Sequence, residues 1–442
     1  MDCVHLPRAM EFERYKNYRR ILLFVFSLLL LWPALNSLSN SNDFEVFLGA
    51  SRRMLNGLDM YHEKVVYDRY LHYYYSPFFA FIIQPFAAIM DYRFPENSIL
   101  PNVELSMLMV KLVWNTLNLF FIYRICKYLL SIFQFETERK AFWFYLIMVF
   151  LCYRWLHINI KYGQLTIFLL YAFFEAYFST KLKEWLKWTP FALGLQIKIL
   201  PIFFYWKMFL DKNYKAMMMV FSLVIVITVI PFLFLDSHYY VMELQMWLKT
   251  INPLKSNHVV QTGEGGFMDI GSIVTKYFTM FRIPNEPRVC VTQLSISQMF
   301  WLTQILRLSI LGAITFLILE LKKIPQLKYN DYLQFSLMCI GIPIIFPHQR
   351  DYSFALFIPA VSYMVYYFLR DREILKPITT TFFFIGLLLM GCVIFFEVFS
   401  LDFRYWIIGV RLMGIGAIIF ALFFFLFIHQ QIKSMKAIIS KP

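Results

Sequence analysis

Charged residues and catalytic signature motifs are both scarce in this sequence. Only 16% of its 442 residues are charged. It contains no Walker-type G-x-x-x-x-G-K-[ST], no G-x-G-x-x-G after a strand, no H-E-x-x-H and no G-x-S-x-G. Nucleotide-driven transport and serine-hydrolase chemistry therefore lack the residues that they need.

The six cysteines form no metal-binding or disulfide pattern. There is no C-x-x-C and no Cys/His cluster, and four cysteines lie in or beside apolar segments: Cys126, Cys152, Cys339 and Cys392. This placement argues against a disulfide framework and against a zinc site. Internal repeats and low-complexity linkers are also absent, which indicates one membrane domain over residues 1–442.

Apolar side chains, in contrast, are abundant. They make up 60% of the sequence, aromatic residues make up 20%, and the mean hydropathy is +0.57. This is more apolar surface than a soluble core can bury, so the surrounding solvent must be lipid. The apolar stretches are roughly 17 to 25 residues long, the length at which a helix crosses a bilayer. The sequence therefore predicts an all-α polytopic integral membrane protein.

Basic residues indicate the orientation of these segments. The net charge is +14, and the Lys and Arg residues lie at the ends of the apolar segments, as the positive-inside rule predicts. Membrane insertion therefore explains the excess of positive charge, and we expect no nucleic-acid partner. A basic N-terminus precedes the first span, 21–38, which we interpret as uncleaved. We place both termini in the cytoplasm, at the cytoplasmic (inner) membrane, with 39–76 and 236–297 as loops on the outer face. The other candidate spans are 103–123, 141–156, 165–178, 217–235, 298–318, 332–346, 354–368, 378–398 and 405–428.

Two apolar segments do not fit a regular alternation of cytoplasmic and outer loops. Residues 77–90 would extend only about 21 Å as a helix. Residues 188–208 have basic clusters at both ends and Pro201 in the middle, so we expect two short helices that enter the membrane and return. Irregular backbone at membrane depth is tolerated only where it lines protein or a watery cavity, so these segments indicate a site.

The stretch 41–61 carries the first candidate residues. Its apolar positions recur at helical spacing, which predicts a helix lying along the outer membrane surface. Asn42 and Glu45 suit its N-terminus, and Gly57 suits its C-terminal stop. Asp43 would lie in the first turn, either as a general base or only as a complement to the helix dipole. On a helix Asp43 and Glu45 point about 200° apart, so we expect no metal ion between them.

Further polar residues interrupt the apolar segments. Tyr75 belongs either to an interfacial aromatic belt or to a surface that stacks on a sugar ring. Lys161 and Gln164 sit at the outer end of a span. Lys198 lies deep in its segment, where a charge is costly, so it either faces a cavity and a lipid phosphate or extends its ammonium to the interface.

A polar break at 347–351 separates two apolar runs. It is either a simple turn or part of a site. In a site, the guanidinium of Arg350 would hold a phosphate through paired donors, and His348 would assist proton transfer.

Five pieces of the sequence, in this order, resemble a known family. They are DFEVFLGASRRMLNGLDMY from Asp43, YYYSPFFAFIIQPFA from Tyr73, GQLTIFLL from Gly163, KILP from Lys198 and HQRDYSFALFIPA from His348. The set is similar to glycosyltransferase family 87 of the GT-C superfamily, the polyprenol-phosphate-mannose-dependent α-mannosyltransferase-like proteins.

The resemblance implies a GT-C-type bundle of about twelve or thirteen membrane helices, some short or re-entrant, around a cavity open to the outer face. It implies an inverting enzyme without metal or cofactor that transfers a hexose, mannose by family default, from a polyprenyl phosphate to a glycolipid or glycan acceptor. By motif match Asp43 is the base, and His348 joins it as a catalytic residue. The expected substrate-binding residues are Glu45, Arg52, Tyr61, Tyr75, Lys161, Gln164, Lys198 and Arg350.

Two other functional classes share some of these features. A transporter or flippase of a lipid-linked or small solute also has half-helices and buried charge, although it would show repeated halves, which we do not find. The second class is a membrane acyltransferase or an assembly partner without catalysis. An acyltransferase would carry a His in a membrane-embedded polar motif, and His348 is the only candidate. The enzyme prediction therefore depends on the stretch around Asp43 and on the resemblance.

Overall fold

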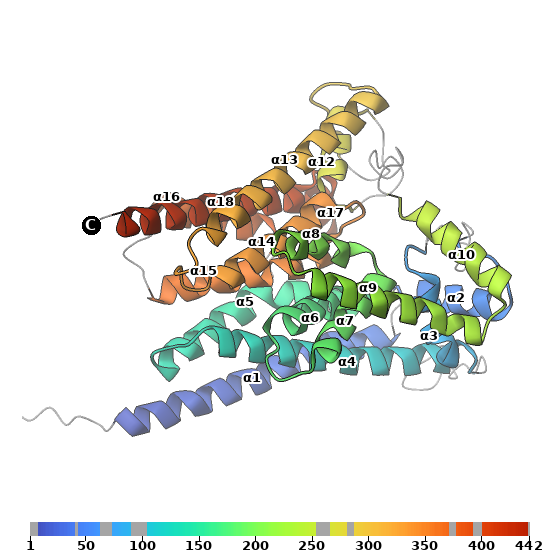
Figure 1. Ribbon diagram of the computed structural model, residues 1–442, viewed down its shortest axis with the longest axis horizontal. Coiled ribbons are helices and arrows are strands. Elements are labelled where there is room, and N and C mark those ends of the chain that lie inside the picture. The colour runs from blue at the N-terminus through green and yellow to red at the C-terminus, as the bar shows by residue number, and fades with distance from the viewer. Residues whose placement is uncertain are drawn as a thin grey trace, which may run out of the picture. The chain divides into compact units, whose positions relative to one another are not determined.

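The computed structural model describes residues 8–39, 43–61, 73–89, 104–252, 266–280, 287–370, 377–391 and 400–440. Every regular element in these ranges is a helix and none is a strand, which confirms the all-α class (Figure 1).

The helices up to residue 250 are α1 (Arg8–Ser39), α2 (Phe44–Leu55), α3 (Pro77–Ala87), α4 (Leu105–Ile132), α5 (Glu138–Tyr162), α6 (Thr166–Phe178), α7 (Glu184–Ile197), η1 (Leu200–Ile202), α8 (Phe203–Leu210), α9 (Tyr214–Val229), η2 (Ile230–Leu233) and α10 (Ser237–Thr250). Those that follow are α12 (Ile270–Phe278), α13 (Ile296–Lys322), α14 (Asn330–Ile345), η3 (Asp351–Phe357), α15 (Ile358–Arg370), α16 (Pro377–Leu389), α17 (Leu401–Gly409) and α18 (Leu412–Ile439).

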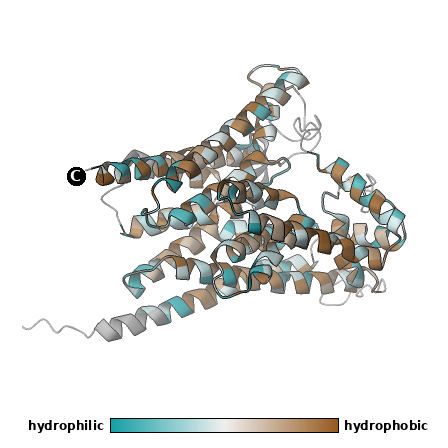
Figure 2. Ribbon diagram, in the orientation of Figure 1, coloured by the Kyte–Doolittle hydropathy of each residue, from teal (hydrophilic) through white to brown (hydrophobic). Residues whose placement is uncertain are grey.

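Seven helical segments within the described ranges are long and apolar enough to cross a membrane: Asn17–Leu38, Leu105–Ile132, Glu138–Tyr162, Tyr214–Leu233, Ile296–Lys322, Asp351–Arg370 and Leu412–Ile439. Four apolar segments are shorter: Pro77–Ala87, Thr166–Phe178, Leu200–Leu210 and Thr380–Leu389. Figure 2 shows apolar residues recurring along the long helices. The protein is therefore a polytopic membrane protein that combines long spans with short apolar helices.

The helix break expected in residues 188–208 is present. Helix α7 ends at Ile197, Lys198 has an extended backbone with φ −144° and ψ 125°, and the chain continues through η1 into α8. The segment 77–90 forms α3, only 11 residues long, with the Ser76 hydroxyl as its N-terminal cap. Both irregular segments identified in the sequence are thus short helices.

The prediction of one continuous span over 405–428 is wrong. Helix α17 ends at Gly409 and α18 begins at Leu412. Between them Arg411 has a left-handed backbone with φ 57°, which no helix can contain. Residues 392–398 of the neighbouring span predicted at 378–398 lie outside the described residues.

By their contacts the helices form two compact units. The first comprises Ser27–Ser131 and His157–Asn252, and we call it the Asp43 unit. Here α2 and α10 pack against α3, and α6 and α9 pack against α7. The rings of Tyr75 and Phe79 lie 4.9 and 5.0 Å from that of Phe47, which fixes α2 against the start of α3.

The second unit comprises Met1–Phe26, Ile132–Leu156 and Pro253–Pro442, and we call it the His348 unit. In this unit α12 and α14 pack against α13, and α16 packs against α18. The ring of Phe133, fully buried, lies 5.0 Å from that of Tyr332 and 4.8 Å from that of Tyr366.

Candidate functional site

Asp43 immediately precedes α2 and does not lie within its first turn, which corrects the sequence-based placement. Its backbone carbonyl accepts a hydrogen bond from Phe47 N at 3.1 Å, but its side chain makes no capping bond to the helix. The carboxylate instead accepts a hydrogen bond from Gln164 Nε2. Asn42, which was expected to cap this helix, lies outside the described residues.

Helix α2 is packed by protein on more than one side. Its buried positions include Val46 and Ala50 as well as Phe47, so they cover more than one face. Leu55, the last residue of α2, is 46% exposed. Gly57 ends the helix with φ 63°, as the sequence predicted.

Gly163 allows α5 and α6 to meet the start of α2. Its φ of 68° is a conformation that glycine adopts at little cost, and a Cβ atom placed there would lie 2.6 Å from Phe44 Cδ2. Because the Phe44 ring rests on this turn, the next residue, Gln164, reaches Asp43. The Gln164 side chain is 1% exposed, and its Oε1 has no hydrogen-bond partner within the described part of the chain.

Lys198 comes to the same place from the break between α7 and η1. Its Nζ lies 5.5 Å from the centroid of the Tyr75 ring, and its charge interacts with the Asp43 carboxylate. A backbone hydrogen bond of 3.2 Å from Ser76 N to Ile197 O ties the start of α3 to this break. One carboxylate and one ammonium, far apart in sequence, therefore converge in the Asp43 unit.

Two other predicted residues on α2 already have partners. Arg52 Nη2 lies 2.8 Å from Glu104 Oε2 and 3.0 Å from Ser106 Oγ. Glu45 interacts through its charge with Lys111, which lies on α4 and is 2% exposed. Sequence reasoning missed Lys111, although a lysine inside the apolar run of α4 is a signal that could have found it.

The remaining two predicted residues of this unit lie beside tyrosines. The Tyr61 hydroxyl donates to Tyr75 O at 2.8 Å, and its ring lies 5.7 Å from that of Tyr73. Lys161 Nζ lies 5.8 Å from the Tyr162 ring centroid. Tyr61 thus connects the segment after α2 to the residue that lies beneath Lys198.

His348 and Arg350 belong to the His348 unit, where both lie against Phe267. His348 has a left-handed backbone with φ 59°, and its ring lies 4.9 Å from that of Phe267. Arg350 is exposed, with Cζ 5.2 Å from the same ring. Met268 N donates to Gln349 O at 2.6 Å, which holds this loop against the start of α12.

Sequence reasoning also missed buried ion pairs in this unit. Arg307, on α13, is 6% exposed, and its Nη2 lies 3.8 Å from Oδ1 of the fully buried Asp269. Arg154 Nη2 lies 3.7 Å from Asp351 Oδ2. A charged residue inside an apolar helix was the available signal in both cases.

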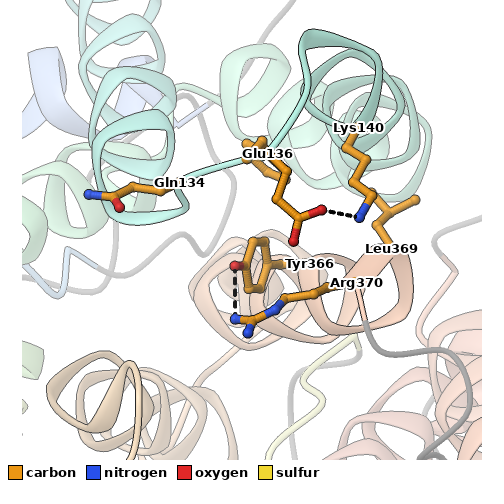
Figure 3. A pocket seen from close by; sticks show the side chains of 7 residues that line it. Gln134, Glu136, Lys140, Tyr366, Leu369 and Arg370 are labelled. Atoms are coloured by element: carbon orange, nitrogen blue, oxygen red, sulfur yellow. Dashed lines mark hydrogen bonds and ion pairs between the residues drawn. The ribbon is translucent and has the colours of Figure 1, made fainter.

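A surface hollow in the same unit is lined by Glu136, Lys140, Tyr366 and Arg370 among others (Figure 3). Glu136 accepts from Lys140 Nζ at 2.8 Å, and Arg370 donates to the Tyr366 hydroxyl at 3.4 Å. These polar groups satisfy one another, so the hollow is a weaker candidate than the Asp43 cluster. No group of three His, Cys, Asp or Glu side chains suited to a metal ion occurs within the described ranges.

Comparison with known families gives the class of the protein. The model of glycosyltransferase family 87 matches residues 73–341, more than half of the sequence. The match includes Gln164 and Lys198 and leaves out Asp43 and His348. No curated protein and no solved structure matches the chain. Given a family match of this extent, the chain belongs to glycosyltransferase family 87 and is a membrane glycosyltransferase.

Proposed function

We propose that this family member is an inverting, metal-independent transferase. Its donor is a hexose, mannose by the family default, carried on a polyprenyl phosphate. Its acceptor is a glycolipid or a glycan, and transfer takes place at the outer face of the cytoplasmic membrane. The observation that carries the proposal is the convergence of Asp43, Gln164 and Lys198 within one unit.

One carboxylate and one cation are enough for this reaction, because a polyprenyl phosphate is a good leaving group once its charge is shielded. The acceptor hydroxyl oxygen attacks the anomeric carbon from the face opposite the phosphate, and its proton passes to Asp43. The bond from the anomeric carbon to the phosphate oxygen breaks, and its electron pair stays on the phosphate beside Lys198. The products are the inverted glycoside and the free polyprenyl phosphate.

Neighbouring residues support these two roles. Gln164 orients the carboxylate through its hydrogen bond, and the Tyr75 ring supports the Lys198 ammonium. Because Glu104 lies 2.8 Å from Arg52 Nη2 and offsets its charge, we propose Lys198 rather than Arg52 as the phosphate ligand.

The other predicted residues complete the assignment by their chemistry alone. In the His348 unit, taken by itself, we propose that the Arg350 guanidinium binds a phosphate and that His348 takes part in proton transfer. Glu45, Tyr61 and Lys161 are assigned to sugar or phosphate contacts.

The test is transfer by the full chain reconstituted in lipid vesicles. Radiolabelled polyprenyl-phosphate hexoses are supplied together with extracted cell lipids, and label in glycolipid is compared with label in the donor. We expect the wild type to transfer mannose and the Asp43→Asn variant to lose at least about a hundredfold in rate, the range for a general base. Asp331→Asn is the control, because Asp331 is an exposed residue in the first turn of α14.

Two results would end the proposal. One is full transfer activity in a normally folded Asp43→Asn variant. The other is movement of labelled donor across the vesicle membrane without transfer, which would identify a flippase.

A further inference from the structure

The inward face of α10 carries three polar side chains, each of which has one buried polar atom without a hydrogen-bond partner within the described residues. Tyr240, Glu243 and Trp247 lie three and four positions apart, so they share one face of the helix. They are 0%, 0% and 7% exposed. The atoms without a partner are the Tyr240 hydroxyl, Glu243 Oε1 and Trp247 Nε1.

This face belongs to the same unit as the candidate site. Helix α10 packs against α3 and η2. The other carboxylate oxygen of Glu243 accepts from Met60 N at 3.4 Å, in the segment that follows α2. Next along the chain, Tyr61 donates to the carbonyl of Tyr75, whose ring lies beneath Lys198. A short series of contacts therefore leads from Glu243 to the proposed phosphate ligand.

A purely structural role accounts for only part of this arrangement. The bond from Met60 N explains one oxygen of Glu243, and packing explains the burial of the rings. It does not explain why three neighbouring side chains each bury an unsatisfied polar atom. Such atoms are destabilising unless another molecule completes their hydrogen bonds.

The chemistry of this face matches a hexose ring. Aromatic rings stack on the C–H face of a sugar, and a carboxylate accepts hydrogen bonds from sugar hydroxyls. The Trp247 indole N–H donates, and the Tyr240 hydroxyl both donates and accepts. The rings of Tyr61 and Tyr73 add further aromatic surface on the facing side.

We propose that Tyr240, Glu243 and Trp247 form a sugar-binding subsite that receives a hexose ring next to the Asp43 site. The proposal rests on the proposed function and adds to it a recognition surface for the substrate. Because the three side chains are buried on the inward face of α10, admission of the ring requires α10 to move outward. The ring belongs either to the acceptor glycan or to the donor, and the two sources are separated by experiment.

The kinetic test uses the reconstituted full chain and three conservative variants: Tyr240→Phe, Glu243→Gln and Trp247→Phe. Gln245→Ala is the control, because Gln245 is exposed on the same helix. KM is measured separately for donor and acceptor. We expect the KM of one substrate to rise about tenfold in Glu243→Gln, the effect of losing one hydrogen bond to a charged group, with kcat changed less. A rise for the acceptor assigns the subsite to the acceptor glycan, and a rise for the donor assigns it to the donor hexose.

A second test does not depend on transfer. Hydrogen–deuterium exchange of residues 237–250 is measured with and without methyl α-mannopyranoside, methyl α-glucopyranoside and glycerol. We expect at least one glycoside, but not glycerol, to change exchange in the wild type and in Gln245→Ala, and to have no effect in Glu243→Gln.

The outcomes are separable. If both KM values stay within about twofold in all three variants and no glycoside alters exchange, the subsite is refuted. If the wild type transfers nothing, the proposed function fails on its own, and the exchange measurement alone decides the subsite. A glycoside effect that persists unchanged in Glu243→Gln also overturns the assignment.

Discussion

The side-chain amide of Gln164 donates a hydrogen bond to the carboxylate of Asp43, although 121 residues separate the two positions. The bond holds the carboxylate away from the amides of α2, to which it makes no capping bond. An acceptor hydroxyl would therefore meet a carboxylate whose orientation is set by the turn between α5 and α6.

The Gln164→Leu variant should lose about tenfold to a hundredfold in transfer rate while binding donor normally, because the base would lose its orienting partner. Gln164→Glu should behave differently. A second carboxylate beside Asp43 raises the pKa of the pair, so the rising limb of the pH–rate profile should move to higher pH. A Gln164→Glu profile that coincides with that of the wild type would contradict the orienting role.

Gly163→Ala should destabilise the Asp43 unit by about 1 to 3 kcal/mol, because a side chain at positive φ is strained and its Cβ would overlap the Phe44 ring. Chemical unfolding followed by tryptophan fluorescence measures the change. Gly312→Ala is the matched control, because no atom lies within 4 Å of a Cβ placed there. If the two variants lost equal stability, the Phe44 contact would not be the cause.

Lys198→Gln should raise the KM for the polyprenyl-phosphate donor about tenfold or more, because the phosphate loses its cation. Lys198→Arg should recover part of the loss, since it keeps the charge but places it differently. The KM for the acceptor serves as the internal control. An effect confined to the acceptor KM would remove Lys198 from the phosphate site.

Packing of α10 should weaken as the pH rises toward neutrality. Burial, with the nearby charge of Asp59, raises the pKa of Glu243 from 4.5 to about 7. Met60 N and Arg53 act in the opposite direction, and Tyr61 and Tyr239 also lie near this carboxyl. With α10 packed, Glu243 keeps its proton to a higher pH than it does when α10 is unpacked. The packed form is therefore most stable below about pH 4.5, where Glu243 is protonated in both forms.

This stability falls until about pH 7 and is constant above it. Hydrogen exchange of residues 237–250, corrected for the intrinsic pH dependence of exchange, should therefore report more opening across this range. The Glu243→Gln variant should lose the dependence, and a wild-type profile that is flat between these limits would contradict it.

Breaking the buried pair in the His348 unit should be costly. Arg307→Met leaves the Asp269 carboxylate buried without its cation, which should cost about 3 to 5 kcal/mol. The double variant Arg307→Met with Asp269→Asn should lose less, because the amide oxygen can still accept from Gly271 N, as Asp269 does at 2.9 Å. Unfolding of the two variants in detergent gives the comparison, and equal losses would contradict the ion-pair explanation.

The helices were largely predictable, because long apolar runs and clusters of basic residues are local signals. Pro201 indicated the break near Lys198, and the short length of the segment at residue 77 indicated α3. The break at Arg411 was not predicted, although Gly409 ends α17 two residues before it and Arg411 is a charge inside an apolar run. These two signals alone do not show that Arg411 adopts a left-handed backbone, which depends on how α17 and α18 pack.

The candidate site was predictable as a set of residues but not as a geometry. Asp43, Gln164 and Lys198 were each identified separately. Nothing in their local sequence showed that Gln164 donates a hydrogen bond to Asp43. Lys111 and Arg307 were overlooked, although a charge inside a long apolar run was a signal for each of them. Their partners come from distant segments, so only the folded chain reveals them.

The hydrogen bond from Ser76 N to Ile197 O joins the main chain at the first turn of α3 to the main chain beside Lys198. This hydrogen bond couples the two main-chain segments, so a shift of Lys198 toward a bound anion should also shift Tyr75. The Tyr75 carbonyl accepts a hydrogen bond from Tyr61, so the shift should extend to Tyr61. We therefore expect an anion at Lys198 and a sugar near Tyr61 to change each other's affinity, by the same factor whichever binds first.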